Sequence, residues 1–242
     1  MDMIQTCSLS KKYKDTEAVK DLNLQVRQGE LFSLLGVNGA GKTTTIRMLS
    51  CLTLPTGGDA FLNGMSILTD SARIKQLIAV SPQENAIAPH LTVRENLLLM
   101  GGVHGFSREK AEKKAAEILQ AMELEPLASR RAGRLSGGWQ RRLSLGMALI
   151  SEPEILFLDE PSLGLDVLAR RELWNQIRRL KGSVTIILTT HYMEEAEALS
   201  DRVGIMKDGT LLACGTPEEL CRQTGTNRLE EAFLQIVQTT QA

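Results

Sequence analysis

The chain has 242 residues, enough to bury a substantial core as one large domain or as a core with an inserted lobe. Its 28 lysines and arginines are balanced by 29 aspartates and glutamates, so no broad basic surface points to nucleic acid as the main partner. The N-terminus has no cationic flank followed by an apolar segment, and no apolar run approaches the ~20 residues that cross a bilayer. We therefore expect neither a secretion signal nor a membrane span.

The four cysteines, Cys7, Cys51, Cys214 and Cys221, show no close paired spacing and lie within apolar patterns. Paired or clustered spacing is typical of disulfide frameworks and of metal sites. We therefore expect reduced, buried cysteines, as in a cytosolic protein.

Short apolar segments along the chain predict strands of two kinds. The alternation at residues 22–26 is typical of a half-buried antiparallel strand near the N-terminus. The dense apolar runs at 31–35, 155–158 and 184–188 are typical of strands buried on both faces of a parallel sheet. Helical patterns lie between these runs, so the sequence predicts an α/β core with right-handed crossovers.

The loop after the first buried run has the composition of a phosphate cradle. It reads Gly-Val-Asn-Gly-Ala-Gly-Lys-Thr-Thr over residues 36–44, and a helical pattern follows at 44–51. Glycines allow successive N–H groups to turn toward one anion, and the start of the helix adds its positive end. Lys42 would neutralise the β- and γ-phosphates, and the Thr43 hydroxyl would hold Mg²⁺. The expected phosphate contacts are Gly36, Asn38, Gly39, Ala40, Gly41, Lys42, Thr43 and Thr44.

A glycine-rich turn that binds no ligand is the alternative for this loop. The strand before it and the helix after it favour the phosphate cradle, because both are parts of the same binding arrangement.

The segment 91–150 interrupts the alternation of strands and helices and is nearly all helical in pattern. Ser107 can cap a helix inside this segment. The apolar stripe of that helix consists of Ala111, Ala115, Ile118, Leu119 and Met122. We therefore expect a helical lobe inserted into the α/β core.

A second anion-binding nest is predicted near the end of this lobe. The residues at 135–140 read Leu-Ser-Gly-Gly-Trp-Gln and precede a helix that runs to about residue 150. Ser136, Gly137 and Gly138 would place a hydroxyl and flexible backbone at the start of that helix.

Two carboxylates follow the apolar run at 155–158. Ligands gather at the carboxyl ends of strands in a doubly wound sheet, so Asp159 and Glu160 should emerge beside the phosphates. Asp159 would hold Mg²⁺ through its water shell, and Glu160 would orient and polarise the attacking water. An acidic pair on a solvated loop is the alternative, and the cradle upstream favours the catalytic interpretation.

The last third of the chain completes the predicted core. A helix at 169–181 carries an apolar face, and we expect Trp174 beside that face to pack. Thr216 and Glu219 form a capping box with proline at the first helical position. We expect one domain over 1–242, with an α/β nucleotide-binding core at 1–90 and 151–222, the helical lobe at 91–150 and a short tail at 223–242.

One chain with a single cradle has no obvious use for a second nest unless two chains share their nucleotides. On these motifs the chain resembles, nearly end to end, the ATP-binding subunits of ABC transporters. The resemblance implies a P-loop NTPase core, a mixed sheet with flanking helices, and ATP hydrolysis with Mg²⁺.

The resemblance also assigns roles to four further residues. Gln83 matches the Q-loop glutamine, which senses Mg²⁺ and the γ-phosphate and lies near the transmembrane partner. Asp166 matches the D-loop aspartate that crosses the dimer interface. His191 matches the switch histidine that contacts the γ-phosphate, and Tyr13 falls where the family places an aromatic ring to stack on adenine. His90 and His104 match no motif, and we expect them to be structural.

In the arrangement that the resemblance implies, two subunits pack head to tail. Each ATP would lie between the cradle at 36–44 of one chain and the nest at 136–138 of the other. Because this chain carries every consensus residue, the second subunit is expected to be the same chain. The further partner would be a separate transmembrane permease, which would place the chain peripherally on the cytoplasmic face of the cell membrane.

The signature segment departs from the family at Trp139, where many members have glutamine. Trp139 either packs the first helical turn or shapes the dimer interface around the nucleotide. Basic residues surround this segment, namely Arg130, Arg131, Arg134, Arg141 and Arg142. RNA binding is one interpretation, but a positive rim that helps to hold the partner's ATP, together with solvated helix faces, is favoured.

Three segments, at 91–97, 143–145 and 229–234, resemble the branch that exports drugs, lipids and polysaccharides. The alternatives are an importer subunit, a soluble ABC ATPase acting on nucleic acid or ribosomes, and a regulatory module without turnover. The sequence does not identify a transported substrate, because specificity would lie in the transmembrane subunit.

Overall fold

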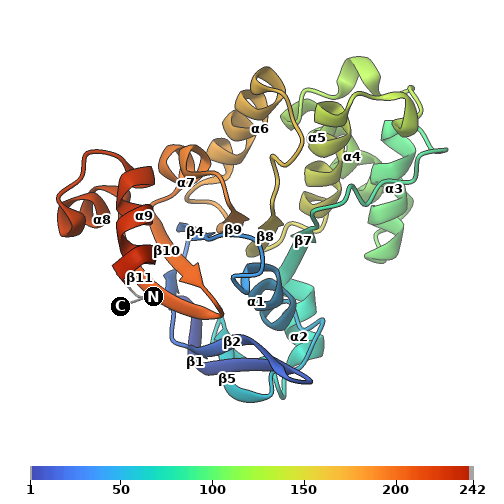
Figure 1. Cartoon of the computed structure of the whole chain (residues 1–242). Coiled ribbons are helices and arrows are strands. Elements are labelled where there is room, and N and C mark those ends of the chain that lie inside the picture. The colour runs from blue at the N-terminus through green and yellow to red at the C-terminus, as the bar shows by residue number, and fades with distance from the viewer. Residues whose placement is uncertain (1, 240–242) are drawn as a thin grey trace.

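The computed structural model describes residues 2–239, and a six-stranded sheet forms its centre (Figure 1). In spatial order its strands are β11 (Thr210–Gly215), β10 (Arg202–Lys207), β4 (Leu31–Leu35), β9 (Thr185–Thr190), β8 (Ile155–Asp159) and β7 (Ile78–Ser81). From β10 to β7 all neighbours are parallel, and only β11 pairs antiparallel. The three apolar runs of the sequence become β4, β8 and β9, buried throughout, which confirms the predicted parallel core.

A second, antiparallel sheet lies beneath the first. Its strands are β1 (Asp2–Tyr13), β2 (Thr16–Leu22), β3 (Gln25–Arg27), β5 (Gly57–Leu62) and β6 (Met65–Ser66), in the order β2-β1-β5-β6 with β3 also paired to β1. The antiparallel part near the N-terminus is therefore confirmed.

The single strand predicted at 22–26 is wrong in detail, because the chain breaks between β2 and β3. The side chain of Thr6 fills the break: its hydroxyl donates to Leu22 O at 2.7 Å and accepts from Leu24 N at 2.8 Å. A threonine from the neighbouring strand thus replaces the ladder bonds that a continuous strand would make.

The helices follow the predicted pattern closely. They are α1 (Lys42–Leu49), α2 (Ser71–Leu77), α3 (Val93–Val103), α4 (Arg108–Ala121), α5 (Gly137–Leu149), α6 (Val167–Leu180), α7 (Met193–Leu199), α8 (Pro217–Thr224) and α9 (Leu229–Thr239), with short 3₁₀ turns at Glu125–Leu127 and Ala132–Arg134. Helix α6 begins two residues earlier than predicted because the Asp166 carboxylate accepts the N–H groups of Leu168 and Ala169.

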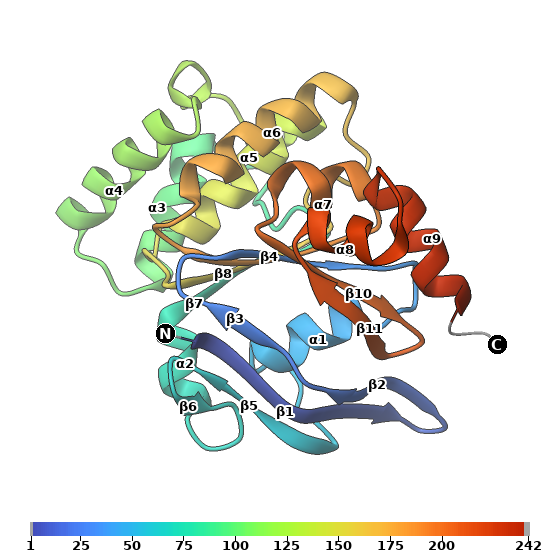
Figure 2. The ribbon, with the colours of Figure 1, turned by 90° about the vertical axis from the view of Figure 1, so that its left-hand side faces the viewer.

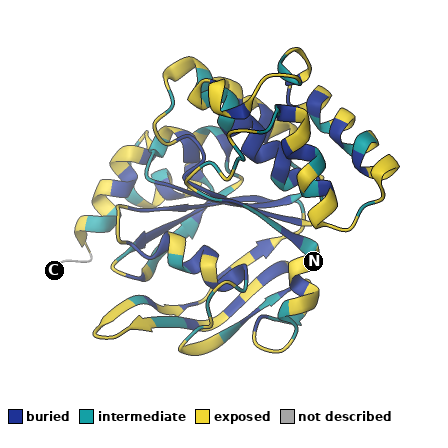
Figure 3. Ribbon diagram, turned by 90° about the vertical axis from the view of Figure 1, so that its right-hand side faces the viewer, coloured by how far each residue is buried: buried dark blue, intermediate teal, exposed yellow. Residues whose placement is uncertain are grey.

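The layers place the site-bearing loops on one edge of the central sheet. Helix α1 lies between the two sheets, where Ile46, Met48 and Leu49 are buried in a core shared by both (Figure 2). Helices α3 to α7 cover the opposite face of the central sheet (Figure 2). In Figure 3 the middle strands of the central sheet are buried, while the outer faces of the helices and the outward residues of the antiparallel sheet are exposed.

The segment predicted as a helical lobe contains α3, α4, both 3₁₀ turns and α5. Ser107 caps α4 by accepting Lys110 N, and Ala111, Ala115 and Leu119 are buried as the stripe predicted. The division into core, lobe and tail stays a prediction, and its end residues 1 and 240–242 lie outside the described residues.

Two expectations about burial are settled by the fold. Trp174 is buried and packs, as predicted. The cysteines are not buried: Cys7 is exposed, since it falls on the outward side of β1, and the other three are half-buried. Within residues 2–239, no helix has the length and apolar character needed to cross a bilayer.

Candidate nucleotide-binding and hydrolysis site

A cavity of about 450 Å³ opens beside α1, at the carboxyl ends of the central strands. Of the predicted site residues, it is lined by Tyr13, Asn38, Gly39, Ala40, Gly41, Lys42, Thr43, Thr44, Gln83, Glu160 and His191. Ala18 and Leu163 also line it, and neither was predicted as a site residue. Gly36 lies just behind, on a smaller neighbouring cavity of about 240 Å³ that Asn38 and His191 share.

The backbone of the cradle requires glycine at two positions. Gly41 has φ +101°, and a Cβ there would lie 2.3 Å from Ala18 O. A Cβ at Gly36 would lie 2.4 Å from Met206 O, so neither position accepts a side chain without backbone movement. Helix α1 then starts at Lys42 with no side-chain cap, which leaves its first N–H groups free for an anion.

Lys42 is buried and its ammonium lies across the cradle. Nζ donates to Gly36 O at 2.7 Å and to Val37 O at 3.2 Å, and it lies 3.3 Å from Glu160 Oε1. The cation is therefore held on the cavity side of the loop, where the β- and γ-phosphates of a bound nucleotide are expected.

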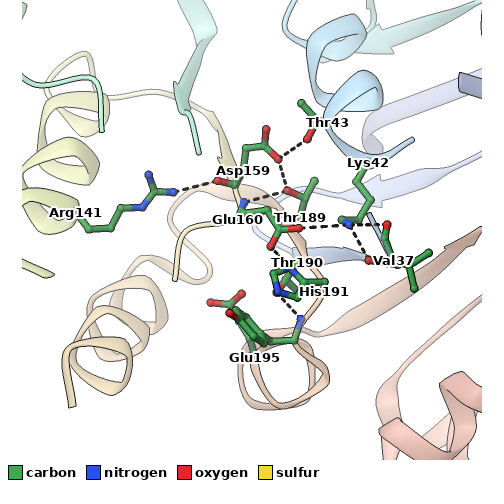
Figure 4. A network of polar contacts seen from close by, with 12 residues as sticks. Val37, Lys42, Thr43, Arg141, Asp159, Glu160, Thr189, Thr190, His191 and Glu195 are labelled. Atoms are coloured by element: carbon green, nitrogen blue, oxygen red, sulfur yellow. Dashed lines mark hydrogen bonds and ion pairs between the residues drawn. The ribbon is translucent and has the colours of Figure 1, made fainter. Parts of the chain in front are cut away.

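Asp159 and Glu160 leave β8 in different directions. The Asp159 carboxylate accepts from Thr43 Oγ1 at 3.0 Å and also accepts the Thr189 hydroxyl (Figure 4). A hydroxyl and a carboxylate oxygen thus meet at the start of α1. These are the hard oxygen ligands that Mg²⁺ prefers, so the residues present fit this cation.

Glu160 is held between the cradle and the strand β9. Its Oε2 lies 2.7 Å from His191 Nδ1, and its Oε1 faces Lys42 (Figure 4). Its backbone has φ +47°, a conformation that costs a non-glycine residue of order 1–3 kcal/mol. The N–H of Glu160 donates to both the backbone oxygen and the hydroxyl of Thr189, each at 3.1 Å, which fixes this geometry.

The second predicted nest lies apart from the cradle. Ser136 and Gly138 at the start of α5 line a separate cavity of about 220 Å³, together with Asp166. Ser136 makes no side-chain cap, although α3, α4, α6 and α8 are all capped in this way. Gly137 follows at the first helical position, so a hydroxyl and the free N–H groups of α5 are presented outward.

The comparisons with known proteins agree with this geometry. Residues 19–163 match the family model described as ABC transporter. Over 241 residues the chain is 39% identical to the linearmycin resistance ATP-binding protein LnrL of Bacillus subtilis, covering 96% of this chain and 78% of that protein. The chain belongs to the ABC transporter family.

Other relatives show where the chain stands within longer proteins. It is 43% identical over 203 residues to the human phospholipid-transporting ATPase ABCA3, covering 84% of this chain but only 12% of that protein.

The fold matches a dimeric post-hydrolysis structure of the ATP-binding cassette MJ0796 bound to ADP and phosphate. That match has a TM-score of 0.79 and 27% identity, and covers 88% of this chain and 98% of that one. The predicted P-loop NTPase fold of an ABC ATPase domain is confirmed.

The arginines around the ABC signature segment need a correction. Arg141 and Arg142 are buried, with 4% of each residue exposed, and so do not belong to a solvated helix face, although Arg142 still lines the cavity of the second nest. Arg142 forms ion pairs with Glu123 and Glu172, and its Cζ lies 4.4 Å from the centroid of the Trp139 ring. Both arginines lie on helix α5, which packs against α6 and against β7, and this packing turns their side chains inward. Arg130, Arg131 and Arg134 are exposed, as expected.

Trp139 packs, which is the first of the two alternatives considered for it: its side chain lies against the core cluster that the helical lobe shares with the central sheet. It also lines the cavity of the second nest, and a role at a dimer interface stays a prediction. The tryptophan is therefore part of the surface that carries Ser136 and Gly138.

The ABC site contains buried polar residues that sequence reasoning missed. Thr189 joins Asp159 to the Glu160 backbone, and its only signal is its place at the carboxyl end of a buried strand. Glu195, in the first turn of α7, accepts a hydrogen bond from Trp174 Nε1 at 2.8 Å, and burial raises the pKa of its carboxyl. Desolvation lowers the pKa of Arg141 to about 10, against the attraction of Glu195 and Asp159.

Proposed function

We propose that this chain is the ATP-hydrolysing subunit of an ABC exporter. One observation carries the proposal: Lys42, Glu160 and His191 meet over a phosphate cradle, while the complementary nest lies elsewhere on the same chain. Such a chain would hydrolyse ATP with its own catalytic residues. Its second nest would contact a nucleotide bound to the cradle of another chain.

The roles of the residues follow from these contacts. Residues 36–44 would bind the phosphates through their N–H groups, with Lys42 as the counter-charge. Glu160 would orient water against the γ-phosphorus and accept its proton as the bond to the bridging oxygen breaks, giving ADP and phosphate. His191, bonded to the same carboxylate, would hold Glu160 in place and reach the γ-phosphate.

Thr43, Asp159 and Gln83 would hold Mg²⁺, which when bound neutralises phosphate charge. Tyr13, exposed at the mouth of the cavity, would stack on adenine. Gln83 is exposed at the same mouth and so would sense the nucleotide beside the transmembrane partner.

Two chains would associate head to tail, each nest at 136–138 completing the partner's cradle, with Asp166 at the junction. Exposed apolar side chains support this, since Leu163, Val167 and Leu168 surround Asp166. Because the shared phosphates bridge both chains, ATP favours the closed pair and ADP does not. The pair would drive a separate permease from the cytoplasmic face of the membrane.

Export is favoured over import by the relatives, since LnrL is named for linearmycin resistance and other relatives for daunorubicin or doxorubicin resistance. The class of substrate that this suggests is an amphipathic drug or lipid. Substrate identity would be set by the permease.

The first test uses Glu160→Gln, which keeps the shape of the side chain but removes the base. We expect phosphate release to fall about 1000-fold, while ATP and Mg²⁺ produce a stable dimer in light scattering. Wild-type turnover in this variant would contradict the role of Glu160.

The same variant tests the membrane partner. Tagged Glu160→Gln chain, incubated with native membranes, ATP and Mg²⁺, should retain a polytopic membrane protein. The matched control adds Lys42→Ala to the same chain and should retain none. Recovery of ribosomes or nucleic acid instead would contradict transport while leaving ATP hydrolysis intact.

A further inference from the structure

The side chain of Arg141 makes an unusual set of contacts beside the site. Its Nε donates to Pro161 O at 2.7 Å and its Nη2 to Asp159 O at 3.1 Å. Its Nη1 donates to Pro82 O and, at 3.3 Å, to Gln83 O. All four acceptors are backbone carbonyls, and within the described residues Arg141 forms no ion pair with a carboxylate.

These four carbonyls belong to two segments that carry proposed catalytic side chains. Pro82 and Gln83 follow β7, and Asp159 to Pro161 end β8, which pairs parallel with β7. Pro82, Gln83 and Pro161 lie just beyond the ends of their strands, where the ladder stops, so their carbonyls need other donors. The planar guanidinium, with five N–H donors in a fixed fork, bridges both segments at once. Figure 4 shows its bond to Asp159.

Burial of this charge is costly, and loss of hydration is the largest cause of the lowered pKa of the Arg141 guanidinium. Because all four hydrogen bonds of this buried cation go to backbone carbonyls, its contacts fix the geometry of the backbone around it. Arg141 also lies one turn after Ser136 and Gly138 in α5, so it connects the outward-facing nest to the catalytic ends of the sheet.

We propose that Arg141 is a positioning residue that fixes the Gln83 loop and the Asp159–Pro161 turn in one geometry and ties both to α5. The proposal rests on the proposed function. Glu160 lies between two of the carbonyls that Arg141 holds, so a change in the tilt of α5 would be passed to the carboxylate through Asp159 and Pro161.

The test compares Arg141→Met with Arg202→Met. Arg202 is a matched control, because it also clamps strands through a guanidinium, bonding Gln25 O at 3.1 Å and Glu30 Oε1 at 3.2 Å. It lies where β10 begins, at the end of the parallel sheet opposite the site. Both variants lose a clamp of similar size, but only one clamp touches catalytic segments.

For Arg141→Met we expect kcat to fall about 100-fold, the cost of a misplaced catalytic group, with ATP affinity within about threefold of wild type. Arg202→Met should keep kcat within about threefold. Arg141→Lys keeps the charge without the fork, and about a tenfold loss of kcat is expected. A wild-type kcat in Arg141→Met, or an equal loss of kcat in Arg202→Met, would overturn the proposal. If Arg141→Met does not fold, the kcat of Arg141→Lys decides in its place.

A second readout does not depend on hydrolysis. Hydrogen exchange over residues 160–165 reports the turn, since Leu163 N donates to Glu160 O and Leu165 N to Ser162 O. Exchange there should accelerate at least about tenfold in Arg141→Met and stay unchanged in Arg202→Met. Unchanged exchange in both variants overturns the proposal. A wild-type chain that releases no phosphate contradicts the proposed function, and the exchange experiment still decides the role of Arg141.

Discussion

Helices α1 and α5 both begin beside glycine without a side-chain cap, and they differ in their surroundings. Both present free N–H groups and a small hydroxyl residue beside glycine. The start of α1 lies within a cavity lined by Lys42, Glu160 and His191, whereas the start of α5 lies on a smaller cavity of about 220 Å³ that has no lysine or histidine in its lining. A phosphate nest thus becomes a catalytic site only where neighbouring strands end beside it. In the proposed function the α5 nest would supply recognition alone, through a contact with the nucleotide of another chain.

The comparison predicts its largest effect at α1. In Lys42→Ala the cradle loses the ammonium that lies across it, and ATP affinity of the isolated chain should fall about 10–100-fold, the value of one or more hydrogen bonds to charged groups. Titration calorimetry of the monomer with ATP and Mg²⁺ measures this. Equal affinities for wild type and variant would remove Lys42 from phosphate binding.

The next effect belongs to α5 and should appear only in dimerisation. Ser136→Ala removes a hydroxyl that caps nothing, so thermal stability should be unchanged. The ATP-dependent dimer, measured by light scattering in the Glu160→Gln background, should weaken about tenfold because one bond to a phosphate is lost.

Ser107→Ala is the matched control for that experiment. Ser107 caps α4 through Lys110 N, so its loss should cost about 1 kcal/mol of stability and leave dimerisation unchanged. If Ser136→Ala instead lowers stability and leaves the dimer intact, the nest is an ordinary helix start.

A smaller effect is expected from Glu195, behind the catalytic group. Because burial raises the pKa of its carboxyl above the ordinary 4.5, the folded chain binds a proton more tightly than the unfolded chain does. The free energy of unfolding therefore falls as pH rises from about 4.5 through the folded pKa, by about 1.4 kcal/mol for each unit by which the pKa is raised.

Glu195→Gln should lose that pH dependence, since the amide is neutral and its oxygen can still accept Trp174 Nε1. Urea unfolding of both chains at pH 5 and pH 8 measures the difference. The variant should gain stability relative to wild type at the higher pH, and parallel pH profiles would show that Glu195 stays ionised in the folded chain.

The smallest effect is expected at Tyr13, at the rim of the α1 cavity. Tyr13→Leu removes the aromatic ring but keeps an apolar side chain, and ATP affinity should fall about 2–10-fold, the value of one aromatic contact. Affinity for inorganic triphosphate, which has no base, should be unchanged. Equal losses for both ligands would assign Tyr13 to the shape of the cavity rather than to adenine.

Local sequence patterns were sufficient for the elements that carry the site. The dense apolar runs predicted β4, β8 and β9, and the glycines together with Lys42 predicted the cradle. Both predictions succeed because strands and cradle are formed by residues that are close neighbours in the chain. The break between β2 and β3 could not be predicted, since the hydroxyl that fills it belongs to Thr6, which the fold brings from another strand. The exposed position of Cys7 was missed because β1 turns it outward.

The sequence by itself determined the phosphate cradle, the acidic pair after a buried strand and the ABC motifs in their order, because each is a short run whose chemistry needs no distant residue. Only the tertiary structure decided which groups meet. It placed Glu160 between Lys42 and His191, gave Thr189 its place beside Asp159, and turned Arg141 inward onto four carbonyls. Those contacts join segments that are far apart in the chain, and their geometry is set by the packing of α5 and the ends of parallel strands.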